Sequence, residues 1–247
     1  MIGGRLDVAA DSARHAGLFL DKFLPGEDER GKGELVSALK EIASVNLATS
    51  PYRLAFSRWK SQWSDRDNVV CVSGMVKGRL ATGLGAESVV ENGLRLHFTY
   101  GTPLIPGSGL KGVLRKAMPS AHKDEGRKDG KKNYEWYLFG DEEHEGAVRI
   151  EDAWWVPPPT GVGTPLALDV LTPHHSAYMK KQGPPTDFDE PVPVHFLTVG
   201  AEQRFLFVIE TPTAAWKEYM RGLLKDTLWR EGVGAKRSAG YGVVEVE

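Results

Sequence analysis

The sequence predicts an α+β protein whose core has a ferredoxin-like order of strands and helices, βαββαβ. Apolar segments rich in β-branched residues recur along the chain as candidate strands, and segments with apolar residues at helical spacing lie between them. Glycine-rich loops stand at two of the junctions. The 247 residues are 41% hydrophobic, which is enough for one buried core of ordinary density.

An N-terminal helical extension, packed on the core, is expected over residues 1–66. Apolar residues recur there at spacings of three and four, which places them on one face of a helix. These residues are Leu35, Leu39, Ile42 and Val45. Residues 67–247 are then expected to form a single domain.

The first half of the predicted core begins with an apolar strand at 69–80, which ends in a glycine turn at 81–85. A second short strand is expected at 94–98. A glycine-rich loop at 101–109 follows, and residues 110–117 have helical composition. The sequence therefore predicts a loop that opens the first core helix.

The second half contains a strand at 147–152 and a more completely buried strand at 204–209, with a long insertion between them. Thr213 can cap a helix, and a last strand is expected at 240–246. The apolar stripe of that helix consists of Trp216, Met220, Leu223, Leu224 and Leu228. The same order of elements forms the core of RNA-recognition modules.

Composition excludes several classes of protein. Cys71 is the only cysteine, so the chain can form no internal disulfide and no cysteine-based zinc site by itself. The N-terminus lacks a basic segment followed by an apolar run, and no stretch of roughly 18 apolar residues occurs. We therefore expect a cytoplasmic protein without a membrane span. The net charge of −2 argues against a uniformly basic surface and leaves room for local basic sites.

The strongest local signal is the glycine-rich loop before the first core helix. Its glycines allow backbone N–H groups to approach an anion, and a helix start adds partial positive charge. Lys111 and Arg115 are one helical turn apart and so share a face. The candidate binding residues are Gly107, Ser108, Gly109, Lys111, Arg115 and Lys116. A phosphate site and an ordinary strand-to-helix turn with surface cations remain equally open on these residues alone.

A second glycine-rich loop lies between the last helix and the last strand. It places cations among glycines, and its candidate binding residues are Gly232, Gly234, Lys236, Arg237, Gly240 and Tyr241. We expect Lys236 and Arg237 to lie near the loop before Lys111, because the last strand of a ferredoxin-like sheet lies close to the first strand and its helix. Neither loop is a P-loop, since Lys111 is followed by Gly112 and Lys236 by Arg237, where a hydroxyl residue is required.

These two loops resemble the signature of RAMP proteins, the RNA-binding subunits of CRISPR systems. The stretches that resemble, within that superfamily, the family of sixth Cmr subunits of type III-B effector complexes are 139–140, 152–154, 168–175, 184–187 and 191–199. The resemblance runs from about Leu80 to the C-terminus. One departure is Gly109, which stands where many relatives have serine.

The resemblance implies a subunit that binds the 3′-side part of the guide RNA and caps a helical filament of related backbone subunits. Its partners would be guide RNA, target RNA and the other Cmr subunits: backbone, small and terminal. It also implies a thumb, a β-hairpin that wedges between guide and target bases, which matches the insertion at 166–198. His174, His175 and Tyr178 in that insertion can stack on bases or donate to phosphates. Simple surface or packing roles for these three residues remain open.

The resemblance also raises the question of catalysis. Related backbone subunits cut target RNA with an aspartate in the loop after the first core strand and a divalent metal. The equivalent residues 83–93 contain Glu87 and Glu91 but no aspartate. We therefore predict a non-catalytic protein without a metal or cofactor. The alternative is a metal-dependent endoribonuclease that uses Glu87 or Glu91, and a nucleotide-binding enzyme is disfavoured because both loops lack the P-loop pattern.

Overall fold

The computed structural model describes residues 15–22, 31–85, 93–119, 133–172 and 193–247. Its helices are α1 (Ala16–Lys22), α2 (Gly31–Ser44), α3 (Ser50–Ser61), α4 (Gly107–Ala117), α6 (Tyr134–Phe139) and α8 (Ala214–Arg230), with the 3-10 turn η3 (Arg237–Ala239). Its strands are β1 (Val69–Val76), β2 (Leu104–Ile105), β3 (Arg149–Ile150), β4 (Ala153–Trp155), β5 (Leu166–Leu171), β6 (Val194–Val199), β7 (Arg204–Glu210) and β8 (Val244–Val246).

The main sheet confirms the mixed α+β class. Its strand order is β2-β4-β7-β1-β8, with β3 also paired to β7, and every pairing is antiparallel. In the order β8-β1-β7-β4, the connection through α4 joins β1 to β4, with β7 between them. The connection through α8 joins β7 to β8, with β1 between them. Each intervening strand is antiparallel to both of its neighbours. This arrangement is consistent with a ferredoxin-like core.

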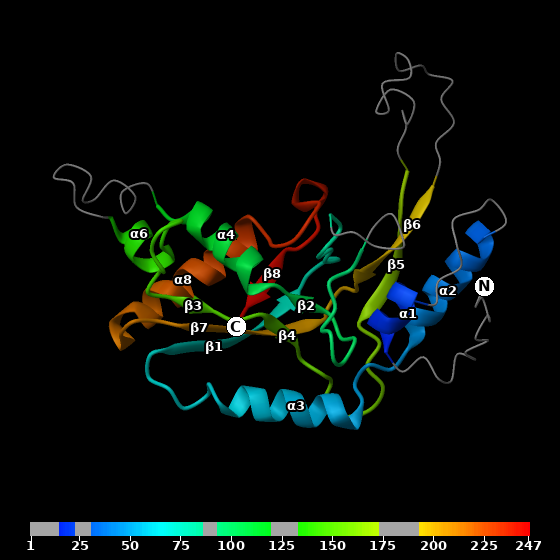
Figure 1. The fold of residues 1–247 in the computed structure, drawn as a ribbon, viewed down its shortest axis with the longest axis horizontal. Helices are drawn as coiled ribbons and strands as arrows, with labels where there is room; N and C mark the ends of the chain where they lie inside the picture. Colours follow the sequence, from blue (N-terminus) through cyan, green and yellow to red (C-terminus); the bar gives the residue numbers. More distant parts are fainter. Residues whose placement is uncertain (1–14, 23–30, 86–92, 120–132, 173–192) are drawn as a thin grey trace, which may run out of the picture.

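The sheet is covered on both faces. Helices α4 and α8 lie on one face and α3 lies on the other (Figure 1). Strand β7 is central, and Phe205 through Ile209 are all buried, as expected for a strand with cover on both sides. On α8, the apolar stripe buries Met220, Leu223, Leu224 and Leu228.

Helix α3 is held to the sheet by stacked aromatic rings. The Tyr52 ring lies nearly parallel to those of Trp154 and Trp155, at centroid distances of 6.1 and 5.8 Å. Trp59 stacks on Trp154 with centroids 4.8 Å apart and an interplanar angle of 7°. Each such pair adds about 0.5–1.5 kcal/mol beyond area burial. Leu39 and Ile42 of α2 belong to the same apolar core as the sheet residues.

Strands β5 and β6 form a separate antiparallel hairpin, which we call the β5–β6 hairpin. Its register runs from Leu166 opposite Val199 to Leu171 opposite Val194. The hairpin extends away from the main sheet beside α2 (Figure 1). Two backbone hydrogen bonds between Leu80 and Val199 tie its base to the residues that follow β1.

Several predicted boundaries were wrong for local reasons. Residues 94–98 form no strand; an isolated bridge joins Leu96 to Pro103, and the chain turns tightly where Gly101 has a φ of 64°. Of the strand predicted at 147–152, only Arg149 and Ile150 form a strand, β3, and β4 begins at Ala153, beyond the predicted end. Strand β8 begins at Val244 because Gly240 and Gly242 adopt left-handed conformations, with φ of 86° and 78°.

One helix start differs from expectation, and a second agrees with it in position. Helix α4 begins at Gly107, with Pro106 at the N-cap position, three residues earlier than predicted. Thr213 does occupy the N-cap position of α8, but its side chain makes no capping hydrogen bond. No helix among the described residues is long and apolar enough to cross a membrane.

Candidate functional site

The first turn of α4 presents bare backbone on the protein surface. Gly107 is buried against the β3–β4 connection, where an added Cβ would collide with the carbonyl oxygen of Ile150. Ser108 and Gly109 are exposed, and a Cβ at Gly109 would meet no atom within 4 Å. Within the described part of the chain, the N–H groups of these two residues have no hydrogen-bond acceptor. They are therefore free to bind an external acceptor.

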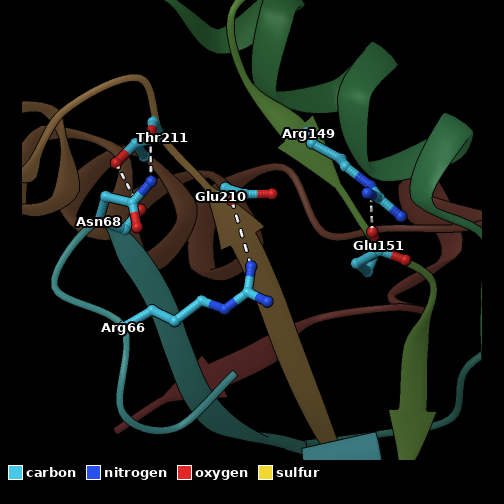
Figure 2. Close-up of polar contacts among 6 residues, drawn as sticks. All are labelled: Arg66, Asn68, Arg149, Glu151, Glu210 and Thr211. Atoms are coloured by element: carbon cyan, nitrogen blue, oxygen red, sulfur yellow. Dashed lines mark hydrogen bonds and ion pairs between the residues drawn. The ribbon is translucent and has the colours of Figure 1, made fainter. Parts of the chain in front are cut away.

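Lys111 lines a hollow of about 280 Å³ beside this turn. Ser108, Glu145 and Arg149 also line it, so two cations and one carboxylate face the same space. Figure 2 shows Arg149 reaching toward Glu151, and the Nε–Oε1 distance is 2.6 Å. Sequence analysis did not identify Arg149, because a lone arginine in a short strand carries no pattern.

Arg115 is already engaged within the protein. Its Nε lies 2.7 Å from Oε1 of Glu135 on α6, in an ion pair that is about half exposed on the arginine side. Lys111 and Arg115 do lie one helical turn apart, but only Lys111 borders the hollow. Lys116 is exposed on the same helix.

The C-terminal loop, residues 232–242, has a conformation that requires its glycines. Gly232, Gly234 and Gly240 have φ of 66°, 85° and 86°. A Cβ at Gly234 would collide with the carbonyl oxygen of Ala81, which also accepts a hydrogen bond from the N–H of Ala235 at 2.8 Å. Lys236 follows in a left-handed conformation with φ of 57°. The loop is therefore held close to the residues that follow β1.

The two glycine-rich loops meet, as expected from the sequence. Gly109 and Pro106 of the first loop and Gly234 and Ala235 of the second line one hollow of about 270 Å³. The cations are less concentrated than expected, since neither Lys111 nor Lys236 lines this shared hollow. The Nζ of Lys236 lies 6.0 Å from the ring centroid of Phe196, on β6.

Tyr241 has a partner within the protein. Its hydroxyl donates a hydrogen bond to Oδ2 of Asp169 on β5, at 2.7 Å, and Nη1 of Arg79 lies 3.2 Å from the same oxygen. Burial, with Asp169 adding to the effect, raises the pKa of the Tyr241 phenol. Arg237 makes a weaker contact, 3.4 Å from Nη1 to the carbonyl oxygen of Glu231.

Five other residues considered in the sequence analysis belong to the insertion and to the loop after β1. His174, His175 and Tyr178 of the insertion, and Glu87 and Glu91 of the loop after β1, lie outside the described residues. The described residues include no group of three or more His, Cys, Asp or Glu side chains that could hold a metal ion.

The polar contacts at the far end of the sheet have a structural explanation. Figure 2 shows Arg66 reaching Glu210, with Nη1 3.4 Å from Oε1, and Asn68 paired with Thr211. These contacts join the start of β1 to the end of β7. We assign them to stabilising the central strand pair.

Comparisons with known proteins give a consistent result. The family model of the RAMP superfamily matches residues 75–245. The chain is 29% identical to the CRISPR system Cmr subunit Cmr6 of Pyrococcus furiosus, over 85% of this chain and 78% of that protein. It is 30% identical to the corresponding Cmr6 subunit of Saccharolobus solfataricus, over 68% of this chain and 52% of that protein, so it spans about half the length of this second relative.

A solved structure shows a similar fold. A chain in the cryo-EM structure of the type III-B Cmr-beta complex bound to cognate target RNA superposes with a TM-score of 0.65 and 23% identity. The match covers 91% of this chain and 78% of that chain.

Proposed function

This chain belongs to the RAMP superfamily and resembles Cmr6, and on that premise we propose that it is a non-catalytic, RNA-binding subunit of a type III-B CRISPR effector complex. In this role it binds the 3′-side part of the guide RNA and caps the filament of backbone subunits. Its partners are then guide RNA, target RNA and the other Cmr subunits.

The observation that carries the proposal is the meeting of the two glycine-rich loops. The exposed N–H groups of Ser108 and Gly109 suit phosphate oxygens, because backbone donors at a helix start bind anions. Lys111 adds a positive charge next to them, in the neighbouring hollow. The chain itself has a net charge of −2, so affinity for RNA has to come from local sites of this kind.

The position of α3 also supports binding at the loops. RNA-recognition modules stack bases on aromatic rings of an open sheet face. Here Trp154 and Trp155, on β4, are stacked against Tyr52 of α3. Within the N-terminal extension, α3 would thus occupy this face of the sheet (Figure 1), with residues 67–247 forming the RAMP domain.

The β5–β6 hairpin is the natural candidate for the base of a thumb. It occupies the ends of the insertion at 166–198 and leads into the residues that carry His174, His175 and Tyr178. We propose that these three side chains contact RNA by stacking or by hydrogen bonds to phosphates.

Catalysis is tested separately from binding. We propose that Glu87 and Glu91 are not catalytic, because residues 83–93 lack the aspartate of cleaving relatives. Replacing both by Gln in the assembled complex should leave every target-RNA cleavage position intact. Loss of one product, with assembly unchanged, would instead assign a metal-dependent nuclease to this subunit.

The binding proposal is tested by assembling the chain with its partner Cmr subunits and a guide RNA. Crosslinks from this chain should map to the 3′-side part of the guide, and Lys111→Ala should weaken them. The control is Lys40→Ala, an exposed cation on α2, which should leave them unchanged. Crosslinks confined to another RNA segment, or none, would contradict the proposal.

A further inference from the structure

One short segment of the chain contacts both the β5–β6 hairpin and the C-terminal loop. We call residues 79–81 the junction segment. On one side, Leu80 donates to the carbonyl oxygen of Val199 at 3.0 Å and accepts from its N–H at 2.8 Å. On the other side, the N–H of Ala235 donates to Ala81 and that of Gly242 donates to Arg79, each at 2.8 Å. Two elements that are distant in sequence are thus fastened to the same backbone.

Side chains close this connection a second time. Nη1 of Arg79 donates to the carbonyl oxygen of Leu168 at 2.5 Å and lies 3.2 Å from Oδ2 of Asp169. The hydroxyl of Tyr241 reaches the same Oδ2 from the C-terminal loop, at 2.7 Å. The Asp169 side chain is only 18% exposed. Its carboxylate therefore joins three chain segments in a partly desolvated position, where hydrogen bonds to a charged group are strongest.

The contact of Lys236 with Phe196 supports the same connection from the other hairpin strand. Its ammonium is 6.0 Å from the centre of this buried ring, at the limit of a cation–π contact. Among the described residues, no backbone hydrogen bond joins the C-terminal loop directly to the hairpin. The polar contacts that connect the two elements are therefore those of the junction segment, the Asp169 carboxylate and this weaker contact.

We infer that Asp169 is a positioning residue for RNA, which holds the hairpin and the C-terminal loop in one relative orientation so that RNA bound at either element stabilises the other. This inference rests on the proposed function, because it takes both elements to contact RNA. It assigns no RNA contact to Asp169 itself. Its content is a coupling between two sites through one carboxylate.

The first experiment measures this coupling without RNA. Tyr241→Phe removes one hydroxyl from the C-terminal loop, and hydrogen exchange is then followed at the Val199 N–H, which belongs to the hairpin. We expect exchange there to rise about tenfold, the scale of a lost hydrogen bond to a charged acceptor. A purely local role for Tyr241 would change only the N–H groups of Ala235 and Gly242.

Matched variants control for the loss of a hydroxyl and of a charge. Tyr137→Phe removes an exposed phenol from α6, and Asp226→Asn neutralises an exposed carboxylate on α8. Neither should change exchange at Val199. Asp169→Ala removes the carboxylate altogether. Asp169→Asn keeps an oxygen that can accept from Tyr241 and loses the charge that faces Arg79, so exchange at Val199 should lie between that of the wild type and that of Asp169→Ala. If Asp169→Ala fails to fold, Asp169→Asn and Tyr241→Phe still decide the question.

The second experiment adds guide RNA to the chain assembled with its partner Cmr subunits. In the wild-type chain, RNA should slow exchange at Val199 as well as at Ala235 and Gly242. In Asp169→Ala the protection at Ala235 and Gly242 should remain while that at Val199 becomes smaller, because only direct contact of RNA with the hairpin is left to supply it. Equal protection of Val199 in both proteins would overturn the inference.

The two arms separate the possible failures. Absence of crosslinks between this chain and the guide RNA in the assembled complex would remove the proposed function, and the RNA-free exchange data would still show whether the two elements are coupled. Unchanged exchange at Val199 in Tyr241→Phe, with RNA binding intact, would remove the coupling and leave the proposed function standing.

Discussion

The backbone N–H of Gly107 donates a hydrogen bond to Oδ1 of Asp152 at 2.7 Å, so a carboxylate from the turn between β3 and β4 caps the first turn of α4. A negative charge at this end of a helix is favourable because the helix dipole is positive there. The contact also fixes the glycine-rich loop to the sheet.

Replacing Asp152 by Ala should lower the free energy of unfolding by about 1 kcal/mol, because the buried Gly107 N–H then loses its acceptor while water partly compensates at this exposed side chain. Asp152→Asn keeps an acceptor and should lose less. Urea unfolding measures both, and Glu142→Ala, at an exposed position, serves as the control. A loss no greater than that of the control would show that the cap is unimportant.

Three glycines of α4 should respond differently to alanine. Gly107→Ala should destabilise the protein, because the new Cβ would meet the carbonyl oxygen of Ile150. At Gly112, where a Cβ meets nothing within 4 Å, alanine should stabilise by about 0.5–1 kcal/mol through helix propensity. Gly109→Ala should give a smaller gain near the helix start. Thermal unfolding of the three variants tests this ranking, which a loss of stability at Gly112 would contradict.

The salt dependence of RNA binding should identify which cation contacts phosphate. Losing one phosphate contact flattens the slope of log K against log salt by about 0.7 for single-stranded RNA. We expect this change for Lys111→Ala and a smaller one for Arg115→Ala, because Arg115 is paired with Glu135. Filter binding at several salt concentrations provides the slopes. A slope for Lys111→Ala equal to that of Lys40→Ala would exclude Lys111 from the RNA contact.

The stability of the protein should depend on pH through His97, which packs in the aromatic cluster formed by Tyr52, Trp59 and Trp154. Its ring lies edge-on to Trp154 at 4.7 Å, and burial lowers its pKa below the usual 6.5, with Asp152 opposing and His15 adding to the shift. A histidine with a lowered folded-state pKa contributes stability that is present above pH 6.5 and lost as pH falls through the folded pKa. We expect the unfolding free energy to decline below pH 6.5.

His97→Gln should flatten that decline in the unfolding free energy. The matched control is His195→Gln on β6, which lies outside the aromatic cluster and should leave the decline of the unfolding free energy below pH 6.5 in place. Denaturant unfolding between pH 5 and pH 7 provides the comparison. An equal decline of the unfolding free energy below pH 6.5 in the wild type and in His97→Gln would contradict the assignment of this decline to His97.

Much of the fold could be predicted because the longer helices and strands have patterns of apolar residues in their own sequences. The β-branched apolar runs predicted the positions of β1 and β7, and the apolar stripe from Trp216 to Leu228 predicted α8. The short strands were harder to predict from the sequence. β2 has two residues and β3 has two, and such pieces are defined by the partner strand instead of by a pattern of their own.

Of the candidate site, too, one part could be predicted from the sequence and another part could not. The sequence by itself determined the two glycine-rich loops, since glycine spacing and neighbouring cations are local properties of the chain. Tertiary structure alone decided the partners of their side chains: Arg115 is paired with Glu135, and Tyr241 with Asp169. These partners are 20 and 72 residues away in sequence, so no local pattern could show them. A hydrogen bond or ion pair depends on distances of a few ångströms, which only packing of the whole chain sets.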